Sequence, residues 1–202
     1  MQAKNILAIN GSYRQGGITD QAVAVAAATL RDAGASVRIV NLRDYPIEFC
    51  TNCRHCTQQP GSAPGQCVIE DGMRDLIEEI EASDALILAA PTNFGSVTAI
   101  FKRFMERLMP YAFWPWEKPW PQFRKAGSRR KKALLISSSA APAWLGRWTF
   151  GSTRQLAYAA KVVGARPAGR LFTGHAAGRL DRAAPSGSAE DARRLARRLL
   201  AN

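Results

Sequence analysis

The stretch Asn5-Ile-Leu-Ala-Ile-Asn10, followed by Gly11-Ser-Tyr-Arg-Gln-Gly-Gly-Ile-Thr19, decides the fold of this chain. A short apolar strand runs into a loop with three glycines, serine and threonine hydroxyls and an arginine, and an alanine-rich helix follows. At such a junction, unpaired backbone N–H groups and the positive end of the helix dipole face one spot. Glycines and hydroxyls let a phosphate approach closely. The loop therefore predicts an anion site at the end of a strand.

Apolar runs and helical stretches alternate along the rest of the sequence, which is typical of a parallel sheet with helices on both faces. We therefore expect an α/β, doubly wound fold. The five expected strands are 5–10, 36–41, 85–90, 132–137 and 165–172. The expected helices are 19–33, 71–82, 98–108, 153–163 and 188–200. Ser188, three residues before Asp191, is the expected cap of the last helix.

Three connections are longer than is usual in such folds, namely residues 42–70, 109–131 and 172–187. In an open parallel sheet the ligand lies beyond the carboxyl ends of the strands. The loop after the first strand, the loop 42–70 and the segment 91–96 all leave the sheet at that edge. We expect these three segments to converge on one crevice.

The composition indicates one substantial core, because the chain has 202 residues of which 47% are hydrophobic. We expect a single domain over residues 1–202. The sequence has no apolar run of the roughly 20 residues that a membrane span needs, and no secretory signal at its start. The expectation is a cytoplasmic protein that does not enter the membrane.

A net charge of +12 raises the question of a nucleic-acid partner. Six of the basic residues fall within residues 124–132, and four more lie on the last expected helix. Neither group forms a known recognition motif, so a solvated surface is the favoured interpretation and nucleic acid is not expected.

The glycine loop lacks G-x-G-x-x-G and the Gly-Lys-Ser/Thr of a nucleotide-triphosphate loop, so a mononucleotide phosphate is the better ligand. Its Gly-Ser-x-Arg start, the segment Ala90-Pro91-Thr-Asn-Phe-Gly-Ser96 and the segment Lys102–Arg107 resemble the NADPH-dependent FMN reductase family of the flavodoxin-like superfamily. Asn93 stands where that family usually has Tyr, and Glu106 where it has Asp. The resemblance implies a flavodoxin-like sheet of order 2-1-3-4-5 and bound FMN.

By this resemblance one group of residues is assigned to the FMN phosphate and a second group to the flavin ring. The phosphate group is Ser12, Arg14, Gly17, Ile18 and Thr19. The ring group is Pro91, Thr92, Asn93, Phe94 and Gly95, with Phe94 as a substitute for the family's Tyr. Ser137, Ser138 and Ser139 end the fourth strand, and they either contact the ring or only terminate the strand.

The expected function is that of an FMN-dependent NAD(P)H oxidoreductase that reduces flavin, a quinone or another small electron acceptor. The flavin carries the hydride chemistry and the protein orients it, so no catalytic acid or base is assigned. The only histidines, His55 and His175, are expected to have structural or solvated roles.

All four cysteines fall in one segment, with the spacing Cys50-x2-Cys53-x2-Cys56-x10-Cys67. Two x2 spacings with a remote fourth thiolate are able to ligate a 4Fe-4S cluster, and the pattern resembles that of iron–sulfur flavoproteins. The alternative function is thus an electron-transfer iron–sulfur flavoprotein that carries FMN and this cluster. The Pro- and Gly-rich gap before Cys67 favours free thiols instead, and zinc is a lesser alternative.

Residues 109–123 contain six large aromatic side chains among four prolines, too many for a solvated loop. One interpretation is a dimer contact or a lid over the flavin, and the other is a flap on the protein's own core. Because relatives in the family commonly dimerise with the flavin near the interface, we expect a homodimer.

Overall fold

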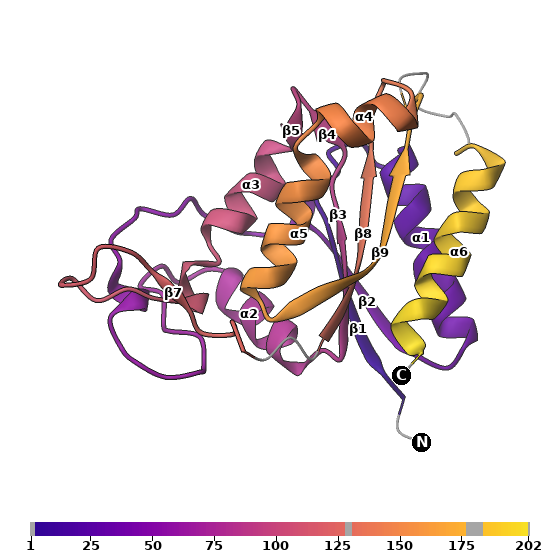
Figure 1. Ribbon diagram of the computed structural model, residues 1–202. Helices are drawn as coiled ribbons and strands as arrows, with labels where there is room; N and C mark the ends of the chain where they lie inside the picture. Colours follow the sequence, from indigo (N-terminus) through magenta and orange to yellow (C-terminus); the bar gives the residue numbers. More distant parts are fainter. Residues whose placement is uncertain (1–2, 128–130, 177–183, 202) are drawn as a thin grey trace.

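The computed structural model describes residues 3–127, 131–176 and 184–201, and its centre is a five-stranded sheet in which every pairing is parallel (Figure 1). The strand order is β2-β1-β3-β8-β9, which is the predicted order 2-1-3-4-5. The strands are β1 (Asn5–Asn10), β2 (Ser36–Asn41), β3 (Ala85–Ala89), β8 (Lys131–Ser138) and β9 (Ala165–Thr173). The flavodoxin-like α/β prediction is confirmed.

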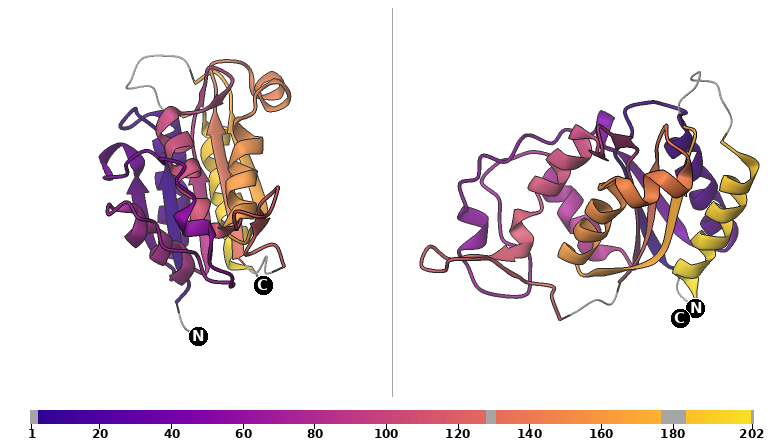
Figure 2. Two further views of the ribbon diagram at one scale, coloured as in Figure 1. Left: turned by 90° about the vertical axis from the view of Figure 1, so that its left-hand side faces the viewer. Right: turned by 45° about the horizontal axis from the view of Figure 1, so that its top comes forward.

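Helices cover both faces of this sheet, as the two views of Figure 2 show. On one face lie α1 (Ile18–Asp32) and α6 (Ser186–Leu200), and on the other lie α2 (Met73–Ala82), α3 (Ala99–Glu106) and α5 (Ser152–Val162). The central strand β3 is buried along its whole length, because helices shield it from both sides. This is why its sequence, Ala-Leu-Ile-Leu-Ala, is continuously apolar.

The five main strands and five predicted helices begin and end within two residues of the sequence-based prediction. The predicted cap of the last helix is wrong. Helix α6 begins two residues earlier, with Pro185 at its N-cap position and no side-chain cap. The Ser188 hydroxyl instead lies 2.7 Å from the Thr173 hydroxyl at the end of β9.

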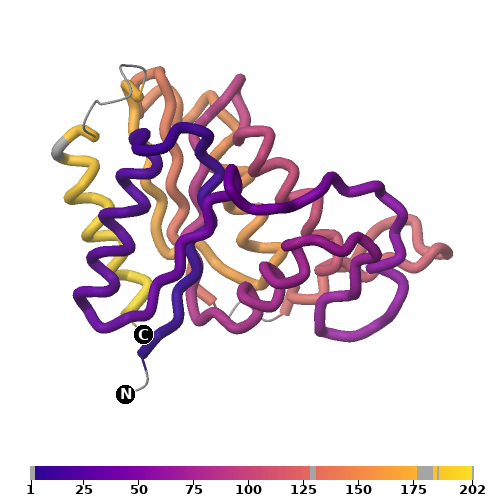
Figure 3. Tube along the Cα trace, turned by 180° about the vertical axis from the view of Figure 1, so that it is seen from behind, coloured from indigo at the N-terminus to yellow at the C-terminus, as the bar shows by residue number. Residues whose placement is uncertain are grey.

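Several short elements were not predicted. Helix α4 (Ala143–Thr149) follows β8, the hairpin β4 (Thr92–Asn93)–β5 (Ser96–Val97) follows β3, and β6 (Ala112–Phe113) pairs with β7 (Gln122–Phe123). The 3-10 helices are η1 (Leu42–Asp44), η2 (His55–Thr57) and η3 (Met109–Tyr111). Seen from behind in Figure 3, the connection from β2 to α2 extends well away from the sheet, and the β6–β7 segment lies beside it.

Candidate functional site

A cavity of about 360 Å³ lies beyond the carboxyl ends of β1, β3 and β8. It occupies the switch point of the sheet, where the chain continues to β2 on one side of β1 and to β3 on the other. The predicted site residues that line it are Ser12, Arg14, Gly17, Ile18, Thr19, Pro91, Thr92, Asn93 and Ser138. Phe94 and Gly95 are not among its lining residues.

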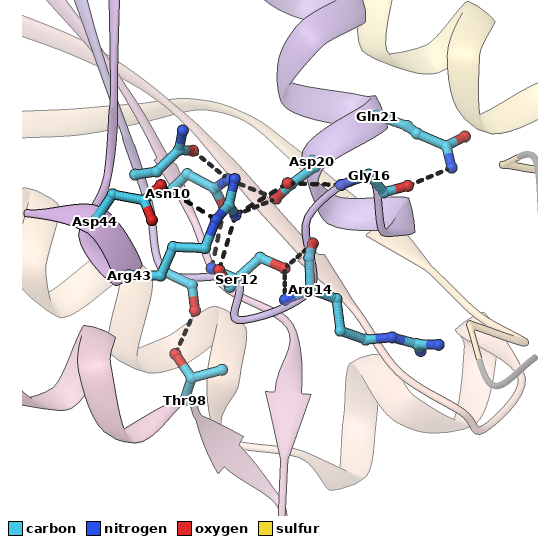
Figure 4. A network of polar contacts seen from close by, with 11 residues as sticks. Asn10, Ser12, Arg14, Gly16, Asp20, Gln21, Arg43, Asp44 and Thr98 are labelled. Carbon is cyan, nitrogen blue, oxygen red and sulfur yellow. Dashed lines mark hydrogen bonds and ion pairs between the residues drawn. The ribbon is translucent and has the colours of Figure 1, made fainter. Parts of the chain in front are cut away.

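A network of hydrogen bonds and an ion pair, shown in Figure 4, stabilises the glycine loop. The Asn10 side-chain amide donates to Asp20 at 2.7 Å, and its oxygen accepts from the Ser12 backbone at 3.1 Å. Arg43 pairs with Asp20 at 3.0 Å and also donates to the Ser12 carbonyl oxygen at 3.0 Å. Both partners of this ion pair are largely buried. The network fixes the loop in place and neutralises the one acidic side chain in the first turn of α1.

The start of α1 has no side-chain cap, because its N-cap residue is Gly17 in an extended conformation. A Cβ at Gly17 would lie 3.1 Å from Arg14 Cβ and 3.2 Å from the Arg14 carbonyl oxygen, so even one methyl group would crowd this turn. The first N–H groups of an uncapped helix need an acceptor, and the helix dipole favours an anion there. The geometry is that of a phosphate cradle.

Three buried hydroxyls surround the cradle. Thr19 Oγ1 lies 2.9 Å from Ser138 Oγ, and the Ser12 hydroxyl donates to the Arg14 carbonyl oxygen at 3.2 Å. All three side chains are nearly inaccessible to solvent. Figure 4 shows the Arg14 side chain extending away from the Asn10–Asp20–Arg43 network. The cavity thus combines hydroxyl donors, backbone donors and a cationic side chain.

The β4–β5 hairpin forms a second wall of the cavity. Thr92 and Asn93 line it, whereas Phe94 stands fully exposed at the hairpin tip with a φ of 49°. The hairpin is anchored from behind, because Thr92 Oγ1 lies 2.8 Å from Ser152 Oγ, which in turn accepts from Ser137 at 3.0 Å. Phe94 is therefore not part of the wall of this cavity. Ser138 and Ser139 line the cavity, and Ser137 holds the hairpin through Ser152.

Sequence reasoning missed several residues that build this site. Asn10, Asp20 and Arg43 support the loop from three separate segments, and only their spatial contacts reveal the role. Thr98 lines the cavity, caps α3 and donates to the Gly11 carbonyl oxygen at 2.6 Å. A threonine directly before a helical stretch was the one available signal, since threonine is a favoured N-cap residue.

The cysteines do not join this cavity, so the expectation of one shared crevice is wrong. All four instead line a separate, narrow cavity together with Arg107. Each is a free thiol. A hydrogen bond from the His55 backbone lowers the pKa of Cys53, and burial raises the pKa of Cys56 to about 11. In the described part of the chain, no three His, Cys, Asp or Glu side chains are placed to hold a metal ion.

The gap before Cys67 is fixed by packing, despite its proline and glycine content. The Gly65 backbone donates to the Pro110 carbonyl oxygen at 2.9 Å, and a Cβ on Gly65 would collide with the Cys56 carbonyl oxygen. Arg107, which is buried, lies 3.7 Å from Cys67 Sγ and forms a two-point ion pair with Asp71 at 2.5 and 2.9 Å. These contacts, which lie outside the gap's own sequence pattern, hold Cys67 at the same cavity as the other three thiols.

The aromatic segment 109–123 packs in part on its own chain. Tyr111 is fully buried, and the Trp114 ring lies 3.8 Å from the Arg54 guanidinium of the cysteine loop. Trp116 and Trp120 are 60% and 69% exposed. None of these side chains lines the 360 Å³ cavity. Within one chain the segment is a flap over the cysteine loop and does not cover that cavity.

The basic cluster after this segment has structural contacts. Arg124 donates to the Pro110 and Gly61 carbonyl oxygens, Lys125 pairs with Glu81, and Lys131 donates to the end of α2. Arg129 and Arg130 lie outside the described residues. Among the residues described, no helix is both long and apolar enough to cross a bilayer.

A parallel sheet of this order with a cavity at its switch point defines the flavodoxin-like class. The chain belongs to the NADPH-dependent FMN reductase family, whose model matches residues 4–167. An iron–sulfur flavoprotein of Archaeoglobus fulgidus is 36% identical over 115 residues, which are 57% of this chain and 49% of that protein. One of Methanocaldococcus jannaschii is 29% identical over 105 residues, 52% of each chain. The chain spans about half the length of these curated relatives.

Solved structures show the same fold. An NAD(P)H:quinone oxidoreductase from Methanothermobacter marburgensis aligns with a TM-score of 0.72 at 17% identity, over 100% of this chain and 98% of that chain. An FMN-dependent NADH-azoreductase from Bacillus anthracis, solved in complex with FMN, aligns with a TM-score of 0.68 at 12% identity, over 99% and 100%. At these identities the likeness concerns the fold alone.

Proposed function

We propose that this chain is an FMN-dependent oxidoreductase that takes electrons from NAD(P)H and passes them to flavin, a quinone or another small acceptor. The observation that carries the proposal is the uncapped N-terminus of α1, which faces buried hydroxyls in a cavity at the switch point of the sheet. Membership in the FMN reductase family supports it. The two structural neighbours, an NAD(P)H:quinone oxidoreductase and an FMN-dependent NADH-azoreductase, support it as well.

In this proposal the chain's residues bind and orient FMN, which supplies the hydride chemistry when bound. Ser12, Thr19 and the first-turn N–H groups of α1 hold the phosphate, and Arg14 adds positive charge at the same end. Residues 91–93 and Ser138 flank the ring. No acid or base is needed from the protein.

The test is anaerobic reduction of the FMN-loaded chain. Addition of NADPH or NADH should remove the visible absorbance of oxidised flavin, and a quinone added afterwards should restore it. A chain that binds FMN but is reduced by neither nucleotide would contradict the NAD(P)H oxidoreductase function and leave the FMN site intact.

A second candidate function is that of an electron carrier with FMN and a 4Fe-4S cluster. The observation that favours it is the cavity that Cys50, Cys53, Cys56 and Cys67 share. Such a cluster spreads its thiolates over four corners, so it does not require the tight arrangement that a single ion needs. Relatives named iron–sulfur flavoproteins support it. Ligation requires four thiolates, and the buried Cys56 would have to lose its proton.

Iron analysis of anaerobically prepared protein separates the two functions. A carrier should contain about four irons per chain and show a broad visible absorption that dithionite bleaches, whereas a simple reductase should contain none.

We further propose a cytoplasmic homodimer of single-domain chains. Several large aromatic side chains are exposed, namely Tyr13 in the wall of the 360 Å³ cavity, Phe94 at the tip of the β4–β5 hairpin, and Trp144 and Trp148 on α4. Exposed aromatic side chains are enriched at protein interfaces, which supports the homodimer.

A further inference from the structure

A second cavity of about 380 Å³ lies between α4, α5 and β9. Its wall contains three arginines, Arg147, Arg154 and Arg170, and no acidic side chain. The wall also contains Phe150, Thr153 and Phe172. We call this cavity the arginine pocket. Its size is within the range of small-molecule sites.

The charges of the arginine pocket are not compensated. Across residues 3–127, 131–176 and 184–201, none of the three arginines forms an ion pair, whereas Arg43 and Arg107 each pair with an aspartate. The first turn of α5 adds to the positive potential, because it has neither an acidic residue nor a side-chain cap. All three arginines are exposed, and three like charges around one cavity give it a positive potential that an anion would offset.

Thr153 provides an independent observation. Its Oγ1 is buried and has no hydrogen-bond partner among the described residues. A buried hydroxyl without a partner destabilises a fold, and such an atom in a native protein needs an explanation. Thr153 lines the arginine pocket, and rotation about its Cα–Cβ bond changes where this hydroxyl points. A ligand oxygen in the pocket would give it a partner.

We propose that the arginine pocket binds a phosphate monoester. A dianion with three acceptor oxygens matches three guanidinium groups and one hydroxyl, and the two phenylalanines provide an apolar wall for the organic part of the ligand. The pocket adjoins the proposed FMN site. A Cβ on Gly146 of α4 would lie 2.7 Å from Ser139 Oγ on one side and 2.7 Å from the Phe172 ring on the other.

Two kinds of ligand contain a phosphate monoester of this kind. One is NADP⁺, through its extra phosphate, and the other is an unrelated phosphorylated metabolite. Binding of inorganic phosphate, NADP⁺ and NAD⁺ should be measured with FMN in excess, so that the glycine loop is filled. Both dinucleotides are oxidised, so no electron transfer complicates the titration. The double variant Arg154→Gln/Arg170→Gln tests the pocket. Arg166→Gln, an exposed arginine of the same strand outside the pocket, is the matched control.

The proposal predicts that the double variant binds inorganic phosphate about tenfold more weakly than wild type, while the control is unchanged. If NADP⁺ binds more tightly than NAD⁺ and the double variant abolishes the difference, the pocket binds the extra phosphate of the NADP(H) reductant. If only inorganic phosphate responds, the ligand is another phosphate monoester. If the double variant binds inorganic phosphate and NADP⁺ as tightly as wild type does, the proposal is overturned. This outcome does not depend on whether the chain binds FMN.

Thr153→Val separates binding from folding. It removes the hydroxyl at constant shape, so the melting temperature without ligand should stay equal or rise, while phosphate binding weakens several-fold. A variant that loses stability and keeps wild-type phosphate binding would show that the hydroxyl serves the fold and contradict its role in the pocket.

Discussion

Thr19 and Ser138 lie 119 residues apart in the sequence, and their hydroxyl oxygens are 2.9 Å apart at the floor of the proposed FMN site. Thr19 lies in the first turn of α1 and Ser138 ends β8, so the contact joins the first and fourth of the sequential strand–helix units. Both side chains are at least 97% buried. A hydroxyl pair at this position has a spare donor or acceptor, which a phosphate oxygen is able to use.

The buried ion pair between Asp71 and Arg107 should be far more important for stability than the exposed pair between Lys102 and Glu106. Asp71→Asn leaves the buried guanidinium uncompensated and should lower the free energy of unfolding by about 3 to 5 kcal/mol. Glu106→Gln, in a pair whose side chains are 50% and 44% exposed, should cost less than about 1 kcal/mol. Urea denaturation of both variants measures the two values, and equal losses would contradict the burial argument.

The same pair predicts an acid dependence of stability. Burial alone would raise the pKa of Asp71, but hydrogen bonds from Arg107 and from the Glu48 and Met73 backbones lower it below its ordinary value of 3.8. The unfolded chain then binds a proton before the folded chain does, so the stabilisation is present above pH 3.8 and lost as pH falls through the folded pKa. Asp71→Asn should show a shallower loss of stability in this window. A parallel pH profile for wild type and variant would contradict the assignment.

Cys53→Ser should leave FMN binding and NAD(P)H oxidation intact, because the cysteine cavity and the proposed FMN site have no lining residue in common. FMN titration and a steady-state assay measure this. Thr57→Val, which removes a buried hydroxyl of the same loop that donates to the Arg54 carbonyl oxygen, is a control for general disturbance of the loop. Loss of flavin in the Cys53 variant alone would show that the two cavities are coupled.

Replacement of Trp144 and Trp148 by serine should weaken the proposed homodimer. These side chains lie four residues apart on α4, so they share a helix face, and they are 70% and 82% exposed. Sedimentation velocity should show a larger monomer fraction in the double variant. Trp120→Ser is the control, since Trp120 is 69% exposed but lies on the β6–β7 segment. If Trp120→Ser dissociates the dimer and the Trp144/Trp148 double variant does not, the interface lies on the β6–β7 segment and the proposed role of α4 is contradicted.

Hydrophobic patterning was sufficient to predict the sheet and five helices, because buried strands such as β3 have an unambiguous apolar run. Helix α4 was missed because its seven residues include Gly146, lack a side-chain cap and leave both tryptophans exposed. The Ser188 cap failed because Pro185 starts the helix earlier. The Asn10–Asp20–Arg43 network could not be predicted, since its members meet only after β1 and β2 pair.

Titration of FMN into wild-type protein and into Ser12→Ala/Thr19→Ala tests the central claim most directly. Wild type should bind one FMN per chain and quench its fluorescence. The double variant should bind at least about tenfold more weakly, because each lost charge-assisted hydrogen bond contributes about 1.5 to 3 kcal/mol. Thr29→Ala, elsewhere on α1, should match wild type. Wild-type protein that takes up no FMN, or a double variant with unchanged affinity, would contradict the account.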